Sequence, residues 1–173
     1  MTEAHDLSER TGLAGTARPV KRVTIYTDGA CLGNPGPGGY GVVLLHQGRR
    51  QELSGGFRRT TNNRMELMGA IVGLRAVGEP SAVTLYTDSR YVADGITKGW
   101  AARWRADGWM RTRTEAAVNP DLWAALLDLC ARHRVTFVWV RGHAGNRENE
   151  RCDALSVRAA QGRNLPADPG YET

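Results

Sequence analysis

The stretch TIYTDGACLGNPGPGG, residues 24–39, is the part of this sequence around which the remainder is organised. Ile25 and Tyr26, with the preceding Val23, have the β-branched and aromatic character of a strand that is at least half buried. Asp28 stands at the expected end of this strand, and a turn rich in Gly, Asn and Pro follows it. Because a buried carboxylate is costly without a partner, we expect a compensating group at Asp28, and a metal ion is one candidate.

Length and composition indicate one globular domain. The chain has 173 residues, of which 41% are hydrophobic and 24% charged, enough for a substantial core. Its net charge of +5 is compatible with a polyanionic partner, although many basic proteins bind no nucleic acid. The three cysteines form no CxxC pair, which favours reduced thiols and a cytoplasmic protein. No apolar run approaches the ~20 residues of a membrane span and no signal-peptide core is found, so we expect no membrane association.

The two ends of the chain lack the periodicity of regular structure. Residues 1–19 are polar and rich in small residues, and residues 162–173 carry Pro166 and Pro169. We therefore expect a disordered N-terminal arm at 1–19, one folded domain at 20–161, and a flexible C-terminal tail at 162–173.

Hydrophobic patterning inside the domain predicts an α/β fold. Short links join the first three strands, whereas helices separate the later ones, so we expect a five-stranded mixed sheet, its first three strands antiparallel, flanked by helices. A helix begins at Asn62 or Asn63, either of which can cap it. Another helix begins near Ser89, and a third follows the Asn-Pro pair at 119–120. The expected strands are 21–27, 40–46, 50–58, 82–87 and 135–140, and a last helix covers 147–160.

Two of these strands carry the same ending. TIYTDG contains Asp28 and TLYTDS contains Asp88, each directly after Tyr-Thr. If the two strands are parallel neighbours, both carboxylates lie at the same edge of the sheet, where ligands commonly bind. The alternative is that each Asp caps a turn or a helix. The residues alone leave both interpretations open.

Three further residues have an ordinary explanation and a functional one. Glu66, near a helix start, favours the helix dipole, and Asp153, within the last helix, suits a surface. His143, in the loop RGHAG, is by default a surface residue, but a histidine beside a metal site shuttles protons. If the four acids converge, their repulsion requires a cation. Oxygen ligands of this kind select Mg²⁺ or Mn²⁺.

Several long motifs together resemble type 1 ribonuclease H, in its single-domain bacterial form. They cover about residues 21–160 and read TDGACLGNPGPGGYG, TTNNRMELMGAI, YTDSRYV, NPDLW and VRGHAGNRENERCDALS. The resemblance implies an endonuclease that hydrolyses the RNA strand of RNA–DNA hybrids by a two-metal mechanism and leaves 5′-phosphate and 3′-hydroxyl ends. It implies that His143 assists proton transfer or product departure, and that Mg²⁺, or Mn²⁺, is bound by Asp28 as the bridging ligand with Glu66, Asp88 and Asp153.

The same resemblance implies a surface that reads the hybrid. Thr61 would hold a DNA phosphate, and Arg90, where relatives often have Gln, would add a backbone contact. A basic protrusion at 100–113 would place Trp100 and Trp104 among its arginines; the alternative is that these tryptophans pack the protrusion against the domain. The minor groove would be contacted by Cys31, Asn34, Asn62 and Asn63.

Three functions compete at this point. The first is the hybrid-specific endonuclease, expected to act as a monomer without an obligate protein partner. The second is a binding module that has lost the chemistry, against which the four acids argue. The third is a nuclease or transposase of the same fold that acts on DNA; through the resemblance, the pair Asn62 and Asn63 and the tryptophan-bearing protrusion favour the hybrid instead.

Overall fold

A computed structural model describes residues 20–172, so the predicted N-terminal arm lies outside the described residues. The strands are β1 (Arg22–Cys31), β2 (Gly36–His46), β3 (Arg49–Thr60), β4 (Ala82–Thr87) and β5 (Arg134–Trp139). They form one sheet in the order β3-β2-β1-β4-β5. The pairs β1–β2 and β2–β3 are antiparallel, and β4 is parallel to both β1 and β5. The predicted five-stranded mixed sheet is confirmed.

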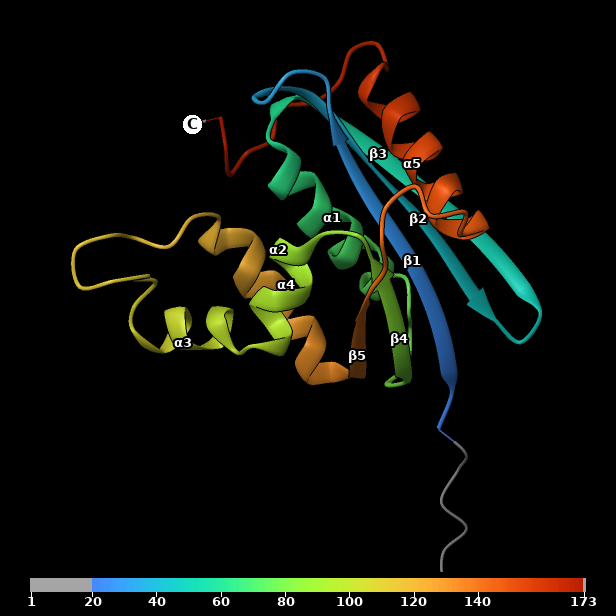
Figure 1. Ribbon diagram of the computed structural model, residues 1–173, viewed down its shortest axis with the longest axis horizontal. Helices are drawn as coiled ribbons and strands as arrows, with labels where there is room; N and C mark the ends of the chain where they lie inside the picture. Colours follow the sequence, from blue (N-terminus) through green and yellow to red (C-terminus); the bar gives the residue numbers. More distant parts are fainter. Residues whose placement is uncertain (1–19, 173) are drawn as a thin grey trace, which may run out of the picture.

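Helices cover both faces of this sheet (Figure 1). The helix α5 (Arg147–Ala160) lies on one face, across β1, β2 and β3. On the other face, α1 (Asn62–Arg75) packs against β1 and against α4 (Pro120–Arg132). The helices α2 (Arg90–Thr97) and α3 (Trp100–Ala106) lead into a protrusion that extends away from the sheet. In the part of the chain that is described, no helix is both long and apolar enough to cross a membrane.

The core lies between the sheet and α1 and α4. Alternate residues of β1 and β4 point into it, so that Ile25 and Leu85 are fully buried. From the helices, Leu67 and Ile71 of α1 and Trp123 of α4 complete the same cluster with no exposed area. Each such side chain contributes roughly 1.5–3 kcal/mol through burial. This packing holds the ends of β1 and β4 in a fixed relation to the start of α1.

Two details near the start of the chain differ from the sequence predictions. β1 continues to Cys31 because its ladder with β2 continues, so Asp28 pairs with Gly41 inside the strand and does not follow its end. The cap of α1 is Thr61, whose hydroxyl accepts a hydrogen bond from the Arg64 amide at 3.3 Å, and not Asn62 or Asn63. Both asparagines are already helical.

The C-terminal residues 162–172, for which the sequence predicts a flexible tail, contact the domain through hydrogen bonds and a buried carboxylate. The Arg58 amide donates to the carbonyl of Pro166 at 2.8 Å. Asp168 is 3% exposed, and its carboxylate accepts hydrogen bonds from the Thr60 hydroxyl and from the Arg64 guanidinium, each at 2.7 Å. A buried carboxylate with these partners ties the end of the chain to the start of α1.

Candidate active site

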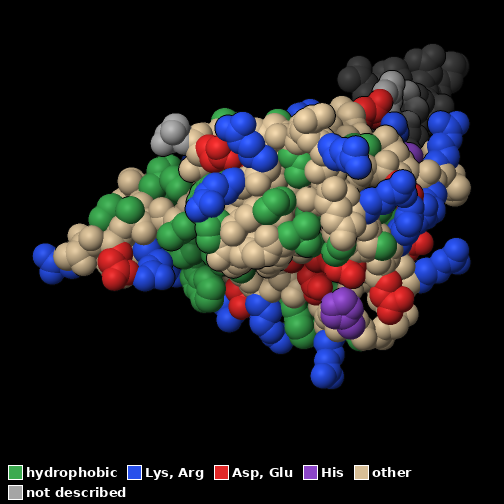
Figure 2. Space-filling view, turned by 90° about the horizontal axis from the view of Figure 1, so that it is seen from above, with side chains coloured by type: hydrophobic (Ala, Val, Ile, Leu, Met, Phe, Trp, Pro, Cys, Tyr) green, Lys and Arg blue, Asp and Glu red, His purple; other side chains and the backbone are tan. Residues whose placement is uncertain are grey.

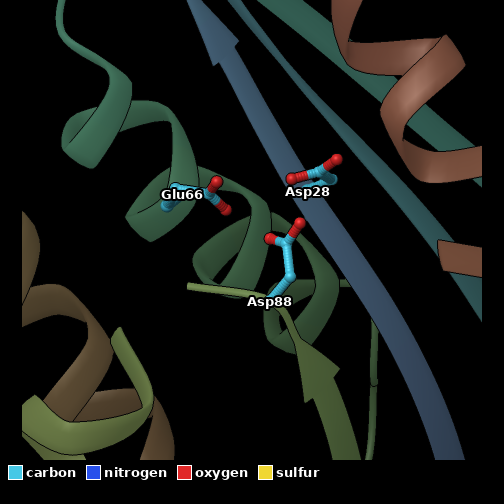
Figure 3. Close-up of side chains that lie close together, drawn as sticks. All are labelled: Asp28, Glu66 and Asp88. Atoms are coloured by element: carbon cyan, nitrogen blue, oxygen red, sulfur yellow. The ribbon is translucent and has the colours of Figure 1, made fainter. Parts of the chain in front are cut away.

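Three carboxylates from separate elements meet at one edge of the sheet (Figure 3). Oxygen atoms of Asp28, Glu66 and Asp88 all lie within 4.8 Å of one another. Asp28 comes from β1 and Asp88 directly follows β4. Because Thr27 and Thr87 are partners in the parallel ladder, the next residue of each strand arrives at the same level. The expected juxtaposition of the two aspartates is therefore found.

Glu66 reaches this place because β1 and α1 approach each other closely. A Cβ atom on Gly29 would lie 2.5 Å from the backbone nitrogen of Glu66, so no other residue fits there without displacing the helix. Glu66 follows the first turn of α1 and is only 6% exposed. Its burial contradicts the ordinary explanation of a surface acid that favours the helix dipole.

The charges of this cluster are not balanced within the described residues. Burial, followed by the charge of Asp88, raises the pKa of Asp28 to about 8. Burial and the charge of Asp28 raise the pKa of Glu66 well above its usual range. One carboxylate oxygen of Glu66 is buried and has no hydrogen-bond partner among residues 20–172. Hard oxygen donors that repel one another and lack partners fit a divalent metal ion such as Mg²⁺.

Two predicted catalytic residues lie at the border of the cluster. Asp153, half-buried in α5, is not among the three clustered acids, but its charge contributes to the raised pKa of Asp28. His143 is exposed in the loop after β5, with a φ of 56°. That loop adjoins the cluster, because a Cβ atom on Gly142 would lie 2.8 Å from an Asp88 carboxylate oxygen.

The predicted minor-groove residues gather where the β1–β2 loop meets the start of α1. The Cys31 thiol donates to the carbonyls of Gly36 and Thr60, both at 3.4 Å. The side-chain oxygen of Asn34 accepts from the Asn62 amide at 3.1 Å, which joins the loop to the helix. Thr61 and Asn63 line a cavity here together with Asn34 and Asn119. Figure 2 shows one face of the molecule on which acidic side chains gather next to a histidine, with Lys and Arg side chains around them.

The two tryptophans that the sequence predicts as hybrid contacts in the protrusion have different environments. Trp104 packs edge-on against the buried Trp123 with ring centroids 6.0 Å apart, which favours the structural alternative for Trp104. Trp100 is 38% exposed, and the Lys98 ammonium lies 5.1 Å from its ring centroid. Trp100 is therefore the more exposed ring of this pair, and Trp104 is partly buried.

Two supporting residues escaped the sequence analysis. Arg64 is 2% exposed, and beside Asp168 it binds the Asp121 carboxylate at 2.7 Å and the Asn119 side-chain oxygen at 3.2 Å. Trp139 donates its indole N–H to the carbonyl of Asp88 at 2.9 Å. The only signal for Arg64 is a charge among the apolar residues of α1, and the signal for Trp139 is its place before the VRGHAG loop.

Comparison with known proteins agrees with this geometry. Residues 20–161 match the family described as RNase H. The chain is 66% identical to a Ribonuclease H of Rippkaea orientalis over 152 residues (88% of this chain, 93% of that protein) and 60% identical to a Ribonuclease HI of a Synechocystis species over 150 residues (86% and 94%). The crystal structure of LC9-RNase H1, a type 1 RNase H with the type 2 active-site motif, superposes with a TM-score of 0.76 at 37% identity, covering 87% of this chain and 77% of that one.

The fold and the carboxylate cluster thus define a hydrolase of phosphodiester bonds, an endoribonuclease. The chain belongs to the ribonuclease H family, in its bacterial type 1 form, whose members degrade the RNA of RNA–DNA hybrids.

Proposed function

We propose that this enzyme cuts the RNA strand of a hybrid internally by a mechanism that requires two divalent metal ions and leaves 5′-phosphate and 3′-hydroxyl ends. The observation that carries the proposal is the cluster of Asp28, Glu66 and Asp88, with the unpartnered buried oxygen of Glu66. Burial and the neighbouring carboxylate charges raise the pKa of both Asp28 and Glu66, so cations are needed for the acids of this cluster to be ionised together at neutral pH.

The acids divide the binding of Mg²⁺, or Mn²⁺, among them. Asp28 would be the ligand shared by the ions, Glu66 and Asp88 of the same cluster would hold one of them, and Asp153 of α5 would help to hold the other. When bound, such ions supply Lewis-acid activation of water and neutralise charge on the attacking and leaving oxygens. The chain itself orients the phosphodiester against these carboxylates.

His143 is the proton-transfer group in this proposal. Its exposed position in the loop that adjoins Asp88 allows it to reach a leaving oxygen and to exchange its proton with solvent. A histidine in this position accelerates the reaction without being needed for metal binding.

Recognition of the hybrid uses the surface beside the cluster. The loop and helix start that carry Cys31, Asn34, Asn62 and Asn63 contact the minor groove, where the 2′-hydroxyls of RNA are displayed. Thr61 contacts a phosphate of the DNA strand. Trp100 and Arg90 contact the duplex on the side of the protrusion, and Trp104 packs against the buried Trp123.

The test offers labelled RNA–DNA hybrid, double-stranded DNA and double-stranded RNA, each with Mg²⁺ or with a chelator. We expect Mg²⁺-dependent cutting of the hybrid's RNA alone, with 5′-phosphate ends, and no cutting by Asp28→Asn. The control Glu79→Gln removes an exposed carboxylate paired with Lys21 and leaves the rate unchanged.

The other outcomes identify the competing functions. Hybrid binding by the unmutated chain without any cutting identifies a binding module, and equal cutting of duplex DNA identifies a nuclease of broader specificity. Cutting that persists in the chelator contradicts the metal mechanism.

A further inference from the structure

Trp139 is a large aromatic residue that remains 38% exposed beside the carboxylate cluster. It is the last residue of β5 and pairs in register with Thr87 of β4. The hydrogen bond from its indole N–H to the Asp88 carbonyl, at 2.9 Å, fixes the main chain that carries one of the three acids. The ring therefore lies at the edge of the cluster and is accessible from solvent.

Arg90 stacks on this ring. Its guanidinium carbon lies 3.8 Å from the ring centroid, well inside cation–π range. Arg90 is exposed, and although it is only two residues from Asp88, it forms no ion pair with any acid in the described part of the chain. Its N–H donors are thus available to a ligand.

The charges of the nearby carboxylates favour an ion pair with Arg90, whereas Arg90 stacks on Trp139 instead. A guanidinium next to acids that repel one another gains charge-assisted hydrogen bonds by pairing with them. Paired in that way, it would occupy carboxylate oxygens that a metal ion needs. Stacking on Trp139 gives the guanidinium a competing position outside the cluster.

We propose that Trp139 is a positioning residue with two effects. It keeps Arg90 off Asp88, so that the carboxylates remain free for metal ions, and it aims the guanidinium at a phosphate of the RNA strand next to the one that is cut. The strand is the RNA strand because the strand that is cut has to pass over Asp28 and Asp88, and Arg90 adjoins Asp88 on the surface. This inference rests on the proposed function.

Binding of a labelled hybrid tests the phosphate contact, measured in chelator with full-length protein carrying Asp28→Asn. We expect Arg90→Gln to raise the Kd about three- to tenfold and to lower the slope of log Kd against log salt by about one. Trp139→Leu should give the same change, with no further loss in the double variant. Trp139→Phe retains an aromatic face, so its Kd should stay within about twofold of the value for the protein that carries Asp28→Asn alone. The matched control Arg134→Gln removes the same charge at the opposite end of β5 and should change nothing.

A neutral linkage identifies the strand. A methylphosphonate is placed in the RNA strand (on a 2′-O-methyl sugar, with the ordinary phosphate on that sugar as control) or in the DNA strand. We expect one RNA-strand position beside the cut at which the neutral linkage weakens binding by the Asp28→Asn protein and has no effect once Arg90→Gln is added. If the only neutral linkage whose effect on binding disappears with Arg90→Gln lies in the DNA strand, Arg90 does not contact the RNA strand, and the proposal is overturned.

Binding of Mg²⁺ alone, measured by calorimetry on the protein without substrate, tests the second effect. In Trp139→Leu the guanidinium is free to pair with the acids, so the Kd for Mg²⁺ should rise about threefold or more. Adding Arg90→Gln to Trp139→Leu should return that Kd to its original value, which mere damage to the site cannot do. A Kd unchanged in Trp139→Leu, or not recovered in the double variant, overturns the proposal.

These tests separate the positioning role from the proposed function. Failure of the unmutated chain to cut hybrid contradicts the proposed function, and the binding and calorimetric measurements do not depend on cutting. An unchanged hybrid Kd in Arg90→Gln overturns the phosphate contact even if the chain cuts hybrid efficiently.

Discussion

Asp168, near the C-terminal end, forms a buried ion pair with Arg64 of α1, 104 residues away in the sequence, with Nε and Oδ2 2.7 Å apart. The two side chains are 5% and 2% exposed. Arg64 also binds Asp121 at the start of α4, so the pair connects three distant segments of the chain.

Loss of this pair should destabilise the protein strongly. Asp168→Asn leaves the Arg64 charge buried with one partner fewer, which typically costs about 3–5 kcal/mol. The free energy of unfolding is measured by urea denaturation. The control is Glu172→Gln, which removes the partner of the exposed Arg58 and should cost less than about 1 kcal/mol. Equal effects of the two variants would show that the C-terminal residues are not held by Arg64.

The metal-free enzyme should lose stability as pH rises. The pKa of Asp28 is about 8 in the folded chain, against about 4 in an unfolded one. The folded chain therefore binds more protons between these pH values, and its free energy of unfolding falls from about pH 4 to about pH 8. Asp28→Asn removes this loss, so in chelator it should stabilise the protein by about 3–4 kcal/mol more at pH 8 than at pH 5. A gain that is the same at both pH values would contradict the raised pKa.

Mg²⁺ binding should release protons. Because Asp28 and Glu66 hold protons in the metal-free state, the ion has to displace them, and its affinity should rise with pH up to about 8. Calorimetry in two buffers that differ in ionisation enthalpy measures the number of protons released. Binding without proton release would show that the acids are already ionised.

His143→Ala should be slow and not inactive. Loss of a group that only assists proton transfer lowers kcat by about 100-fold, whereas Asp28→Asn should fall to background. Single-turnover rates on the hybrid measure the difference. His46→Ala is the control, since that side chain bonds to the Arg22 carbonyl at the other end of β1. A loss equal to that of Asp28→Asn would place His143 among the metal ligands.

The arginines of the protrusion should contribute unequally to binding. Arg105 is paired with Asp128 at 2.8 Å, and Arg111 is paired with Glu115. Arg103 forms no ion pair within residues 20–172 and is exposed. Arg103→Ala should therefore raise KM and lower its salt slope by about 0.9, and Arg105→Ala should do so less. The same KM in both variants would show that the ion pair with Asp128 does not reduce the contribution of Arg105 to hybrid binding.

The sequence by itself determined the order of elements and part of the site. Patterns of period two and of helical period predicted all five strands and the last helix at Arg147–Ala160. The repeated Tyr-Thr-Asp made a shared site of Asp28 and Asp88 one of two interpretations, and the parallel pairing of β1 with β4, which brings residues at equal positions to the same edge, decides between them. The strands and helices follow from residues close together in the chain, and the possibility of a shared edge follows from the general geometry of parallel strands, so both can be inferred from sequence.

Tertiary structure alone decided the remainder. Nothing local shows that Glu66 is buried, since this follows from the close approach of β1 at Gly29. Nor does the C-terminal sequence, rich in polar residues and Pro, show that Asp168 is docked, since its partner Arg64 lies 104 residues earlier. The position of Arg90 is set by Trp139, which arrives from another strand. In each case the decisive interaction joins residues far apart in the chain, so its free energy is absent from any local pattern.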